Sequence, residues 1–450
     1  MVDKKWLKTQ ARKVRQVDWI DPALYRKYGV KRGLRNDNGT GVLVGLTTIG
    51  NVHGYVMNEG EKQPIPGELY YRGINVKDIV DADRREHRFG YEETAYLLLF
   101  GELPTARQLV DWKNKVGSYR RLSDGFKENA IMRNPSRDIM NALARAVLFA
   151  YAFDPEGTPD DLSLEKCLEQ SIDLIGSIPT IAAYAYQAKA HYHNGASLMI
   201  RNPDPRKSTA ENILMLTRED GRYTRLEAET LDLALILHAE HGGGNNSSFT
   251  THVVTSANSD IYSSVAASIL SLKGSRHGGA NLRVMRQMEE IQANVKDWRK
   301  ASDVVRYLEL IADRKAGDGT GLIYGLGHAV YTISDPRAQM LRAKAEALAR
   351  EKGREAEMRL FETIEERGPE VIRARHKSAA DICANVDLYS GFVYKMLGVP
   401  KDLYTPLFAI ARCVSWCAHR MEELVNAGPI IRPAYKPIFH PKKYVRLTDR

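Results

Sequence analysis

Apolar and polar residues alternate with the period of an α-helix along most of this chain. Leucine- and alanine-rich stretches free of proline recur, and each is long enough for two or more helical turns. The clearest predicted helices are 91–101, 140–153, 226–241, 261–272, 304–311, 338–352 and 407–425. A stretch rich in Val, Thr and Gly predicts a short hairpin within 39–56, continued by 69–74. The predicted fold class is therefore mainly α, with a minor N-terminal β element.

Length and composition indicate two domains with ordinary cores. The 450 residues exceed the usual size of one domain, and 43% of them are hydrophobic. No apolar run is long enough to span a bilayer, and the N-terminus lacks the apolar region of a secretory signal. The four cysteines form no CxxC pair, which is typical of unpaired thiols in a reducing compartment. We therefore expect a cytoplasmic protein with no membrane partner.

Positive charge is concentrated at the N-terminus. The net charge is +9, and residues 1–32 contain ten Lys and Arg against three Asp. A basic segment can bind nucleic acid, but aromatic interleaving and RNA-binding signatures are missing. We interpret the segment as a solvated arm and expect no nucleic-acid partner. The excess charge also suits a protein that acts on anions.

His241 is the first candidate for chemistry. Leu226, Thr230, Leu233, Leu237 and His241 follow helical spacing, so the histidine shares a mostly apolar face and points inward. Three glycines then end the predicted helix. A core histidine bonded to backbone would give the same pattern. A metal site made with His238 is less favoured, because HxxH lacks the HExxH geometry and no further ligands stand out.

His277 stands before two glycines in KGSRHGGAN. Glycine loses the most backbone entropy when it is fixed, so we expect the backbone or a ligand to come close there. A new helix is predicted from about Ala280, which places His277 at a helix entrance where free N–H groups favour anions and a neutral imidazole. The alternative is a plain tight turn.

A third histidine lies in YGLGHAVYTISDPRA. Gly325 and Gly327 before His328 make no dinucleotide fingerprint, because no βαβ unit surrounds them. Ser334 or Asp335 can cap a helix whose first turn then contains Arg337. A cation in that place opposes the helix dipole, which favours a role in binding an anion, with a surface salt bridge as the alternative.

One carboxylate completes the set. Asp387, in NVDLYSG, lies at the predicted start of a helix. An aspartate there can simply complement the helix dipole. None of these residues is decisive by itself.

Taken together, the stretches HAEHGGGNNSS, GSRHGGAN, GLGHAVYTISDPRA and NVDLYSG resemble the citrate synthase family, in that family's order. The spacings agree as well, with 36 residues from His241 to His277 and 9 from His328 to Arg337. Upstream, LYYRGINVKDI and YEETAYLLLFGELPT are similar to the family's N-terminal region. The resemblance covers roughly residues 40 to 440.

The resemblance implies a role for each residue. His277 and Asp387 are expected to enolise the acetyl group of acetyl-CoA, and His328 to hydrogen-bond the ketone of oxaloacetate. The other expected oxaloacetate ligands are His241, Arg337, Arg412 and Arg432. The backbone around Leu322, Gly325, Leu326 and Gly327 is expected to bind coenzyme A. No resident metal or permanently bound cofactor is expected.

The resemblance also implies a two-domain helical fold and a homodimer. The expected large domain comprises 1–277 and a return segment, 385–450, and the small domain comprises 278–384. Arg432, which follows Arg412 by 20 residues, is expected to reach the partner subunit's site.

Two alternatives remain open. A 2-methylcitrate synthase would use propionyl-CoA, whose additional methylene is worth only about 1 to 3 kcal/mol of discrimination. A catalytically silent paralogue that binds coenzyme A or oxaloacetate would be expected to lack His277 or Asp387, and both are present.

Overall fold

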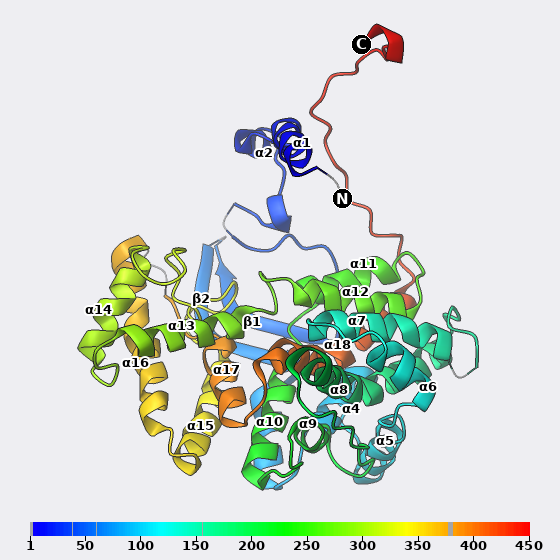
Figure 1. Cartoon of the computed structure of the whole chain (residues 1–450), viewed down its shortest axis with the longest axis vertical. Coiled ribbons are helices and arrows are strands. Elements are labelled where there is room, and N and C mark those ends of the chain that lie inside the picture. Colours follow the sequence, from blue (N-terminus) through cyan, green and yellow to red (C-terminus); the bar gives the residue numbers. More distant parts are fainter. Residues whose placement is uncertain (1–2, 38, 60, 155, 377–380) are drawn as a thin grey trace. The chain divides into compact units, whose positions relative to one another are not determined.

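The computed structural model consists of two compact units, Met1–Leu46 and Thr47–Arg450 (Figure 1). The residues it describes are 3–37, 39–59, 61–154, 156–376 and 381–450.

The first unit contains helices α1 (Lys4–Val17) and α2 (Pro22–Lys27) and a 3₁₀ turn, Arg32–Leu34. Asp3 caps α1 by accepting from the backbone of Lys5, and Asp21 caps α2. Neither helix has a buried residue, so local capping rather than core packing defines them. The exposure fits the predicted solvated arm, although its helices were not predicted.

The second unit opens with a three-stranded antiparallel sheet of order β1-β2-β3. Its strands are β1 (Gly50–Asn58), β2 (Glu61–Tyr71) and β3 (Ile74–Asn75). The hairpin prediction was right in kind but wrong in its bounds, because residues 42–46 form no strand and β2 begins well before 69. Pro64 and Pro66 lie in the first half of β2 and hid it, since proline inside a run argues against a strand.

Helices make up most of the rest of this unit (Figure 1). The longer ones are α3 (Val76–Arg85), α4 (Tyr91–Phe100), α5 (Ala106–Ser118), α7 (Ile139–Ala150), α8 (Leu164–Asn194), α9 (Thr209–Thr217), α10 (Arg225–His238), α11 (Asn246–Thr255), α12 (Ile261–Lys273), α13 (Ala280–Asn294), α14 (Ala301–Ala312), α15 (Pro336–Glu351), α16 (Glu355–His376), α17 (Val386–Met396) and α18 (Tyr404–Asn426). The short turns are α6 (Asp124–Phe126), a π-helical turn (Lys127–Met132), and 3₁₀ turns at Tyr151–Phe153, Lys401–Leu403 and Leu447–Asp449. The mainly helical class is confirmed.

Local sequence explains several helix starts. Ser208 with Glu211 and Thr224 with Glu227 form capping boxes at α9 and α10, in which each side chain bonds the other residue's backbone N–H. Asp335 caps α15, with Pro336 at its first position, as the sequence predicts.

Helix α18 is the centre of the core. It packs against α4, α8, α10, α11 and α12, and its segment Arg412–Arg420 is buried throughout. Within the described part of the chain, no helix is long and apolar enough to cross a membrane.

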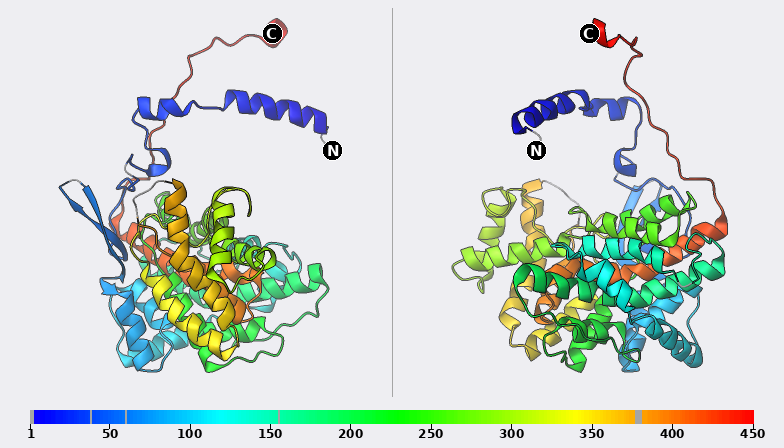
Figure 2. Two further views of the ribbon diagram at one scale, coloured as in Figure 1. Left: turned by 90° about the vertical axis from the view of Figure 1, so that its left-hand side faces the viewer. Right: turned by 45° about the vertical axis from the view of Figure 1, so that its right-hand side comes forward.

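A second group of helices lies beside this core (Figure 2). Helix α14 packs on α16, α15 packs on α16 and α17, and α13 packs on α17. The predicted small domain, 278–384, contains α13 to α16, and its boundaries stay a prediction.

Candidate active site

The rings of His241 and His328 contact each other edge to face. Their ring centroids are 5.1 Å apart with planes at 78°, and Tyr331 stacks on His328 at 4.8 Å and 24°. Helix α10 ends at His238, so His241 lies in the following loop and not on the helix face, as the sequence pattern had placed it. Burial, then Arg337, lowers the pKa of His241 well below its ordinary value, so its ring is neutral.

The tautomer of His328 follows from its own loop. The backbone N–H groups of Val330 and Tyr331 both donate to Nδ1, each at 3.1 Å. A nitrogen that accepts two hydrogen bonds carries no proton, so a neutral ring has its N–H at Nε2. His328 is thereby a hydrogen-bond donor at Nε2.

The N-terminal sheet holds this histidine loop in place. The Tyr331 hydroxyl donates to the Glu68 carbonyl at 3.1 Å, and the Gly67 N–H donates to Ser334 Oγ at 3.1 Å. A Cβ at Gly67 would lie 2.2 Å from the Ser334 carbonyl oxygen, so only glycine permits this approach. The β element that looked minor in the sequence is a support for the site.

The opposite end of the same loop is bonded to the entrance of α17. Leu326 and Ala384 form an antiparallel bridge, the Gly327 N–H donates to the Cys383 carbonyl at 2.8 Å, and Asn385 Nδ2 donates to the Gly327 carbonyl at 2.8 Å. Of the residues predicted to bind coenzyme A, Leu322 is 52% exposed. Gly325 and Gly327 both have positive φ, at 87° and 85°, which explains the two glycines.

Asp387 lies in the first turn of α17, as predicted. Asn385 caps the helix by accepting from the Asp387 N–H at 3.0 Å. Burial raises the pKa of the Asp387 carboxyl to about 6, against an opposing effect of Arg337. The carboxyl is therefore a stronger base than an exposed aspartate and is still ionised at neutral pH.

Arg337 is only 4% exposed, and it is paired with its own helix cap. Its Nε donates to Asp335 Oδ1 at 3.0 Å and its Nη2 to Oδ2 at 2.8 Å. The same carboxylate accepts from the backbone of Val386 at 3.2 Å. The sequence left an anion ligand and a surface salt bridge open, and the surface alternative is wrong because the pair is buried. Asp335 compensates for the cation in the first turn.

Arg412 is fully buried, and most of its donors are unused. Nε donates to the His238 carbonyl at 2.8 Å, whereas Nη1 and Nη2 have no hydrogen-bond partner among the described residues. Its guanidinium carbon lies 4.9 Å from the centroid of the Phe408 ring. Burial lowers the pKa of Arg412 to about 10, which still leaves it charged. A buried cation with two free donor groups is arranged for an anion.

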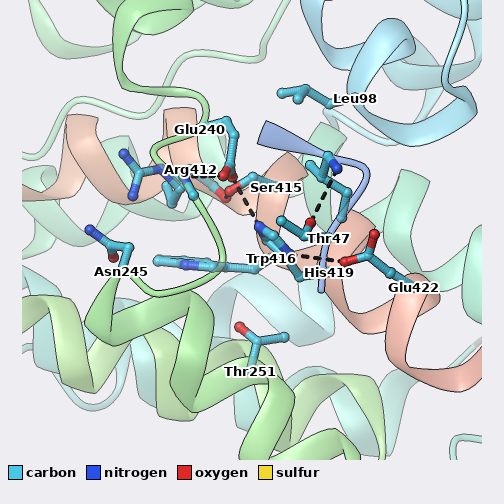
Figure 3. Close-up of polar contacts among 12 residues, drawn as sticks. Thr47, Leu98, Glu240, Asn245, Thr251, Arg412, Ser415, Trp416, His419 and Glu422 are labelled. Carbon is cyan, nitrogen blue, oxygen red and sulfur yellow. Dashed lines mark hydrogen bonds and ion pairs between the residues drawn. The ribbon is translucent and has the colours of Figure 1, made fainter. Parts of the chain in front are cut away.

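His277 lies in the turn before α13, which begins at Ala280 as predicted. Its Nε2 is 3.2 Å from Ser247 Oγ, which also accepts from Trp416 Nε1 at 3.2 Å (Trp416 is seen beside Arg412 in Figure 3). Burial, then Arg412, lowers the pKa of His277 to about 4, so the imidazole is neutral at physiological pH.

Gly278 has a packing role. A Cβ there would lie 2.4 Å from the Leu272 carbonyl oxygen and 2.8 Å from Thr405 Cγ2. The glycine therefore lets the turn pack against the end of α12 and the start of α18. The sequence predicted that the backbone or a ligand comes close here, and at Gly278 it is the backbone of Leu272 that does so. Gly279 is not required in the same way, because a Cβ there would make only ordinary contacts.

Arg432 lies apart from this set in the single chain. It is exposed in the segment after α18, and the N–H of its neighbour Ile431 donates to Ser256 Oγ at 3.1 Å. Its predicted role in a partner subunit stays a prediction.

Electrostatics connects the remaining residues. Arg412 lowers the pKa of His277, Arg337 lowers that of Asp387, and both arginines lower that of His241. Four residues position them. Sequence reasoning gave Asp335 only as a possible helix cap and assigned no role to Ser247, Tyr331 and Asn385. All four stand inside the quoted motifs, but their contacts could not be read from spacing.

Comparison with known proteins agrees with this geometry. A sequence model of the family described as "Citrate synthase, C-terminal domain" matches residues 38–434. The chain belongs to the citrate synthase family.

Relatives in the citrate synthase family span most of both chains. Citrate synthase from Haloferax volcanii is 34% identical over 82% of this chain and 88% of its own, and 2-methylcitrate synthase 1 from Corynebacterium glutamicum is 31% identical over 94% and 98%. Among solved structures, citrate synthase from Pyrobaculum aerophilum superposes with a TM-score of 0.75 at 30% identity, covering 91% of this chain and 94% of that one. A ternary complex of the Thermoplasma acidophilum citrate synthase with carboxymethyl coenzyme A and oxaloacetate has the same TM-score at 27% identity, over 94% and 99%. The chain is thus an enzyme of the acyltransferase type.

Proposed function

We propose that this enzyme condenses acetyl-CoA with oxaloacetate to give citrate and coenzyme A. The observation that carries the proposal is Arg412, a fully buried guanidinium whose Nη1 and Nη2 have no partner among the described residues. It lies within electrostatic range of His277 and His241. A dicarboxylate with a ketone is a substrate that satisfies both the cation and the imidazoles.

Oxaloacetate is bound by its two charges. Arg412 offers two N–H-bearing nitrogens to one carboxylate, and planar guanidinium groups bind carboxylates in this two-point manner. Arg337 is the second cation, held in place by Asp335. His241 is neutral, and its Nε2 is buried with no hydrogen-bond partner among the described residues, so it can bond the substrate without adding charge.

His328 polarises the ketone of oxaloacetate. Its Nε2–H donates to the ketone oxygen, which makes the carbonyl carbon more electrophilic. The same donor stabilises the alkoxide that forms during attack, and a donor fixed in advance by its loop needs no reorganisation at that moment.

Asp387 and His277 generate the nucleophile. Asp387 removes a proton from the thioester methyl group, and the raised pKa of its carboxyl makes it a better base. Ser247 has one hydroxyl proton, which can be directed to Asn245 Oδ1 at 2.9 Å or to His277 Nε2 at 3.2 Å. In the second arrangement the imidazole proton is on Nδ1, and this N–H donates to the developing enolate oxygen.

The remaining steps balance without a redox partner. The enolate carbon forms a bond to the ketone carbon of oxaloacetate, and the alkoxide takes up a proton to give citryl-CoA. Water then cleaves the thioester, which releases coenzyme A and the new carboxylate.

The coenzyme A thioester is proposed to bind along Leu322 to Gly327. A cavity of about 240 Å³ adjoins this loop and is lined by Arg283 and Arg286, with Tyr324 on its wall. The Arg283 guanidinium carbon lies 5.6 Å from the centroid of the Tyr324 ring. Two arginines beside an aromatic ring suit a phosphorylated nucleotide.

A homodimer is part of the proposal. Arg432 is exposed on its own chain, which supports a contribution to the partner subunit's site. Mixed dimers of Arg432→Ala and Asp387→Ala chains should then regain activity, because one site of each mixed dimer is intact. Full activity in a verified monomer would contradict the shared site. The four free cysteines support a cytoplasmic location.

The deciding experiment measures release of the thiol of coenzyme A with oxaloacetate and each of two acyl-CoA substrates. We expect a larger kcat/KM for acetyl-CoA than for propionyl-CoA. The reverse preference would favour the 2-methylcitrate alternative, which the Corynebacterium glutamicum relative keeps open. Binding of oxaloacetate without any thiol release would favour the silent paralogue. The Asp387→Ala variant, with its helical circular dichroism unchanged, is the control for uncatalysed release.

A further inference from the structure

A second cluster of ionisable side chains lies behind the active site, between α11 and α18. His252, on α11, and His419, on α18, face each other with His252 Nε2 and His419 Nδ1 only 3.2 Å apart. Glu422 Oε2 lies 3.7 Å from the same His419 Nδ1 (Figure 3). These three ligand atoms all lie within 4.8 Å of one another.

Each histidine is oriented by a carboxylate on its far side. His419 Nε2 is 3.2 Å from Glu240 Oε2, and His252 Nδ1 is 2.8 Å from Glu423 Oε2. A carboxylate that accepts from the outer nitrogen fixes the tautomer whose lone pair points inward. Metal-ligating histidines almost always donate the outer N–H to a carboxylate, a backbone carbonyl or water, and here both histidines have a carboxylate in that place.

The inner atoms are matched to a small cation. If both rings are neutral, two imidazole lone pairs face each other across 3.2 Å and repel, so either a proton or a metal cation belongs between the two nitrogens. A tetrahedral zinc ion with bonds of about 2.0 to 2.1 Å separates its ligand atoms by roughly 3.3 to 3.5 Å. Glu422 Oε2 is buried and has no hydrogen-bond partner among the described residues, whereas its other oxygen accepts from the Thr48 backbone at 2.6 Å.

We propose that His252 Nε2, His419 Nδ1 and Glu422 Oε2 bind a divalent transition-metal ion such as Zn²⁺, with Glu240 and Glu423 as outer partners of the two histidines. Water completes a tetrahedral shell. An ion can reach the cluster, since the His252 and Glu422 side chains are 14% and 10% exposed. None of the three ligands belongs to the set assigned to the substrates, so the proposed metal is structural.

Such a metal would join the elements that hold the active site. Helix α11 begins beside Ser247, which contacts His277, and α18 carries Arg412. Glu240 is the residue before His241 and is 0% exposed. Glu422 also fixes the backbone of Thr48, just before β1. The ion would therefore tie two helices and the start of the sheet together directly behind the substrate site.

The competing occupant is a proton. Glu240 and then Glu422 raise the pKa of His419 to about 9, so in metal-free protein an imidazolium can donate to His252. If the cluster binds only this proton, zinc will neither bind at one ion per chain nor raise the unfolding temperature. The two occupants are distinguished by binding measurements that need no activity.

The test uses the full-length protein, stripped with a chelator and dialysed against Zn²⁺. We expect one zinc per chain by elemental analysis, a rise in the unfolding temperature with zinc, and, with Co²⁺ as the probe, the visible absorption of a four-coordinate site. His252→Gln and Glu422→Gln should weaken zinc affinity more than tenfold. Glu423→Gln removes only an outer partner and should weaken it about tenfold.

The matched control is His440→Gln, an exposed histidine outside the cluster that should leave zinc binding unchanged. Circular dichroism of each metal-free variant establishes whether it is folded. If His252→Gln or Glu422→Gln does not fold, the zinc affinity of Glu423→Gln still tests the proposal. The proposal is overturned if the wild-type protein binds no stoichiometric zinc, or if all variants bind it as the wild type does.

Discussion

The guanidinium of Arg337 donates two hydrogen bonds, of 3.0 and 2.8 Å, to the buried carboxylate of Asp335. This pair joins the start of α15 to the start of α17, because Asp335 also accepts from the backbone of Val386. A cation of the proposed substrate site is therefore oriented by a residue only two positions away.

Replacing Asp335 with Asn should destabilise the fold. The change leaves a buried arginine without its counter-charge, which costs about 3 kcal/mol or more of unfolding free energy. Urea unfolding measures it. The control is Asp313→Asn, which breaks a solvent-screened surface pair with Arg375 and should cost much less. Equal losses in the two variants would contradict the buried role.

Activity should fall as the solution is acidified. The proposed base, Asp387, acts only when ionised, and its pKa is raised to about 6. We therefore expect kcat/KM for acetyl-CoA to decline as the pH falls through about 6. His277 is already neutral across this range, because its pKa is about 4. A profile that stays flat down to pH 4.5 would exclude Asp387 as the base.

Asp387→Asn should give an inactive but more stable protein. The carboxyl pKa in the folded state lies above its ordinary value of 3.8, so ionisation weakens the fold, and this loss is complete above about pH 6. Removing the charge should raise the free energy of unfolding by about 3 kcal/mol at neutral pH, since the shift is about two pKa units. The gain should shrink as the pH falls toward 3.8, the ordinary pKa, because the wild-type carboxyl becomes protonated first in the folded and then in the unfolded state. Thermal unfolding at pH 4 and 7.5 tests both points.

Arg412→Met should abolish oxaloacetate binding without unfolding the protein. The wild-type side chain is a buried cation with two unpaired nitrogens, and an apolar side chain of similar length removes that penalty. We expect an equal or higher unfolding temperature without ligand. Oxaloacetate should raise that temperature for the wild type and have no effect on the variant. A variant that is still stabilised by oxaloacetate would show that Arg412 does not bind the dianion.

Ser247→Ala should lower kcat by about tenfold or more and change KM little. Ser247 touches no substrate in the proposal, and it positions His277 through a contact of 3.2 Å. Trp416 would also lose its acceptor, so Trp416→Phe in the same background should add little further loss. Strictly additive losses in the double variant would mean that the two residues act separately.

Helix positions were largely predictable from periodicity, and the failures have physical causes. The longest helix, Leu164–Asn194, was missed because Pro179 interrupts it and because it is buried on nearly every side, which removes the amphipathic signal. The predicted helix 226–241 was three residues too long, because the terminal turn depends on the backbone around Ala239 rather than on side-chain pattern.

In the candidate site, too, some residues could be proposed from local sequence and others could not. His277, His328 and Asp387 could be proposed as site residues from the sequence because they lie in short motifs with unusual glycines or helix starts. Trp416 and Glu68 lie 169 and 263 positions from the residues they contact, and no local pattern connects them. The His252 and His419 pair was invisible for the same reason, since 167 positions separate the two.

The hydrogen bond from Tyr331 to the Glu68 carbonyl also bears on how the enzyme is made. The hairpin leaves the ribosome early, yet the loop it supports is synthesised more than 250 residues later. At about 5 to 20 residues per second, that delay is tens of seconds or less. During this delay the face of the hairpin at Gly54 and Gly67 is uncovered, because the loop that packs on it has not yet been made. Catalytic competence should consequently arise only after translation ends, and nascent chains halted before residue 331 should be the forms that most need a chaperone.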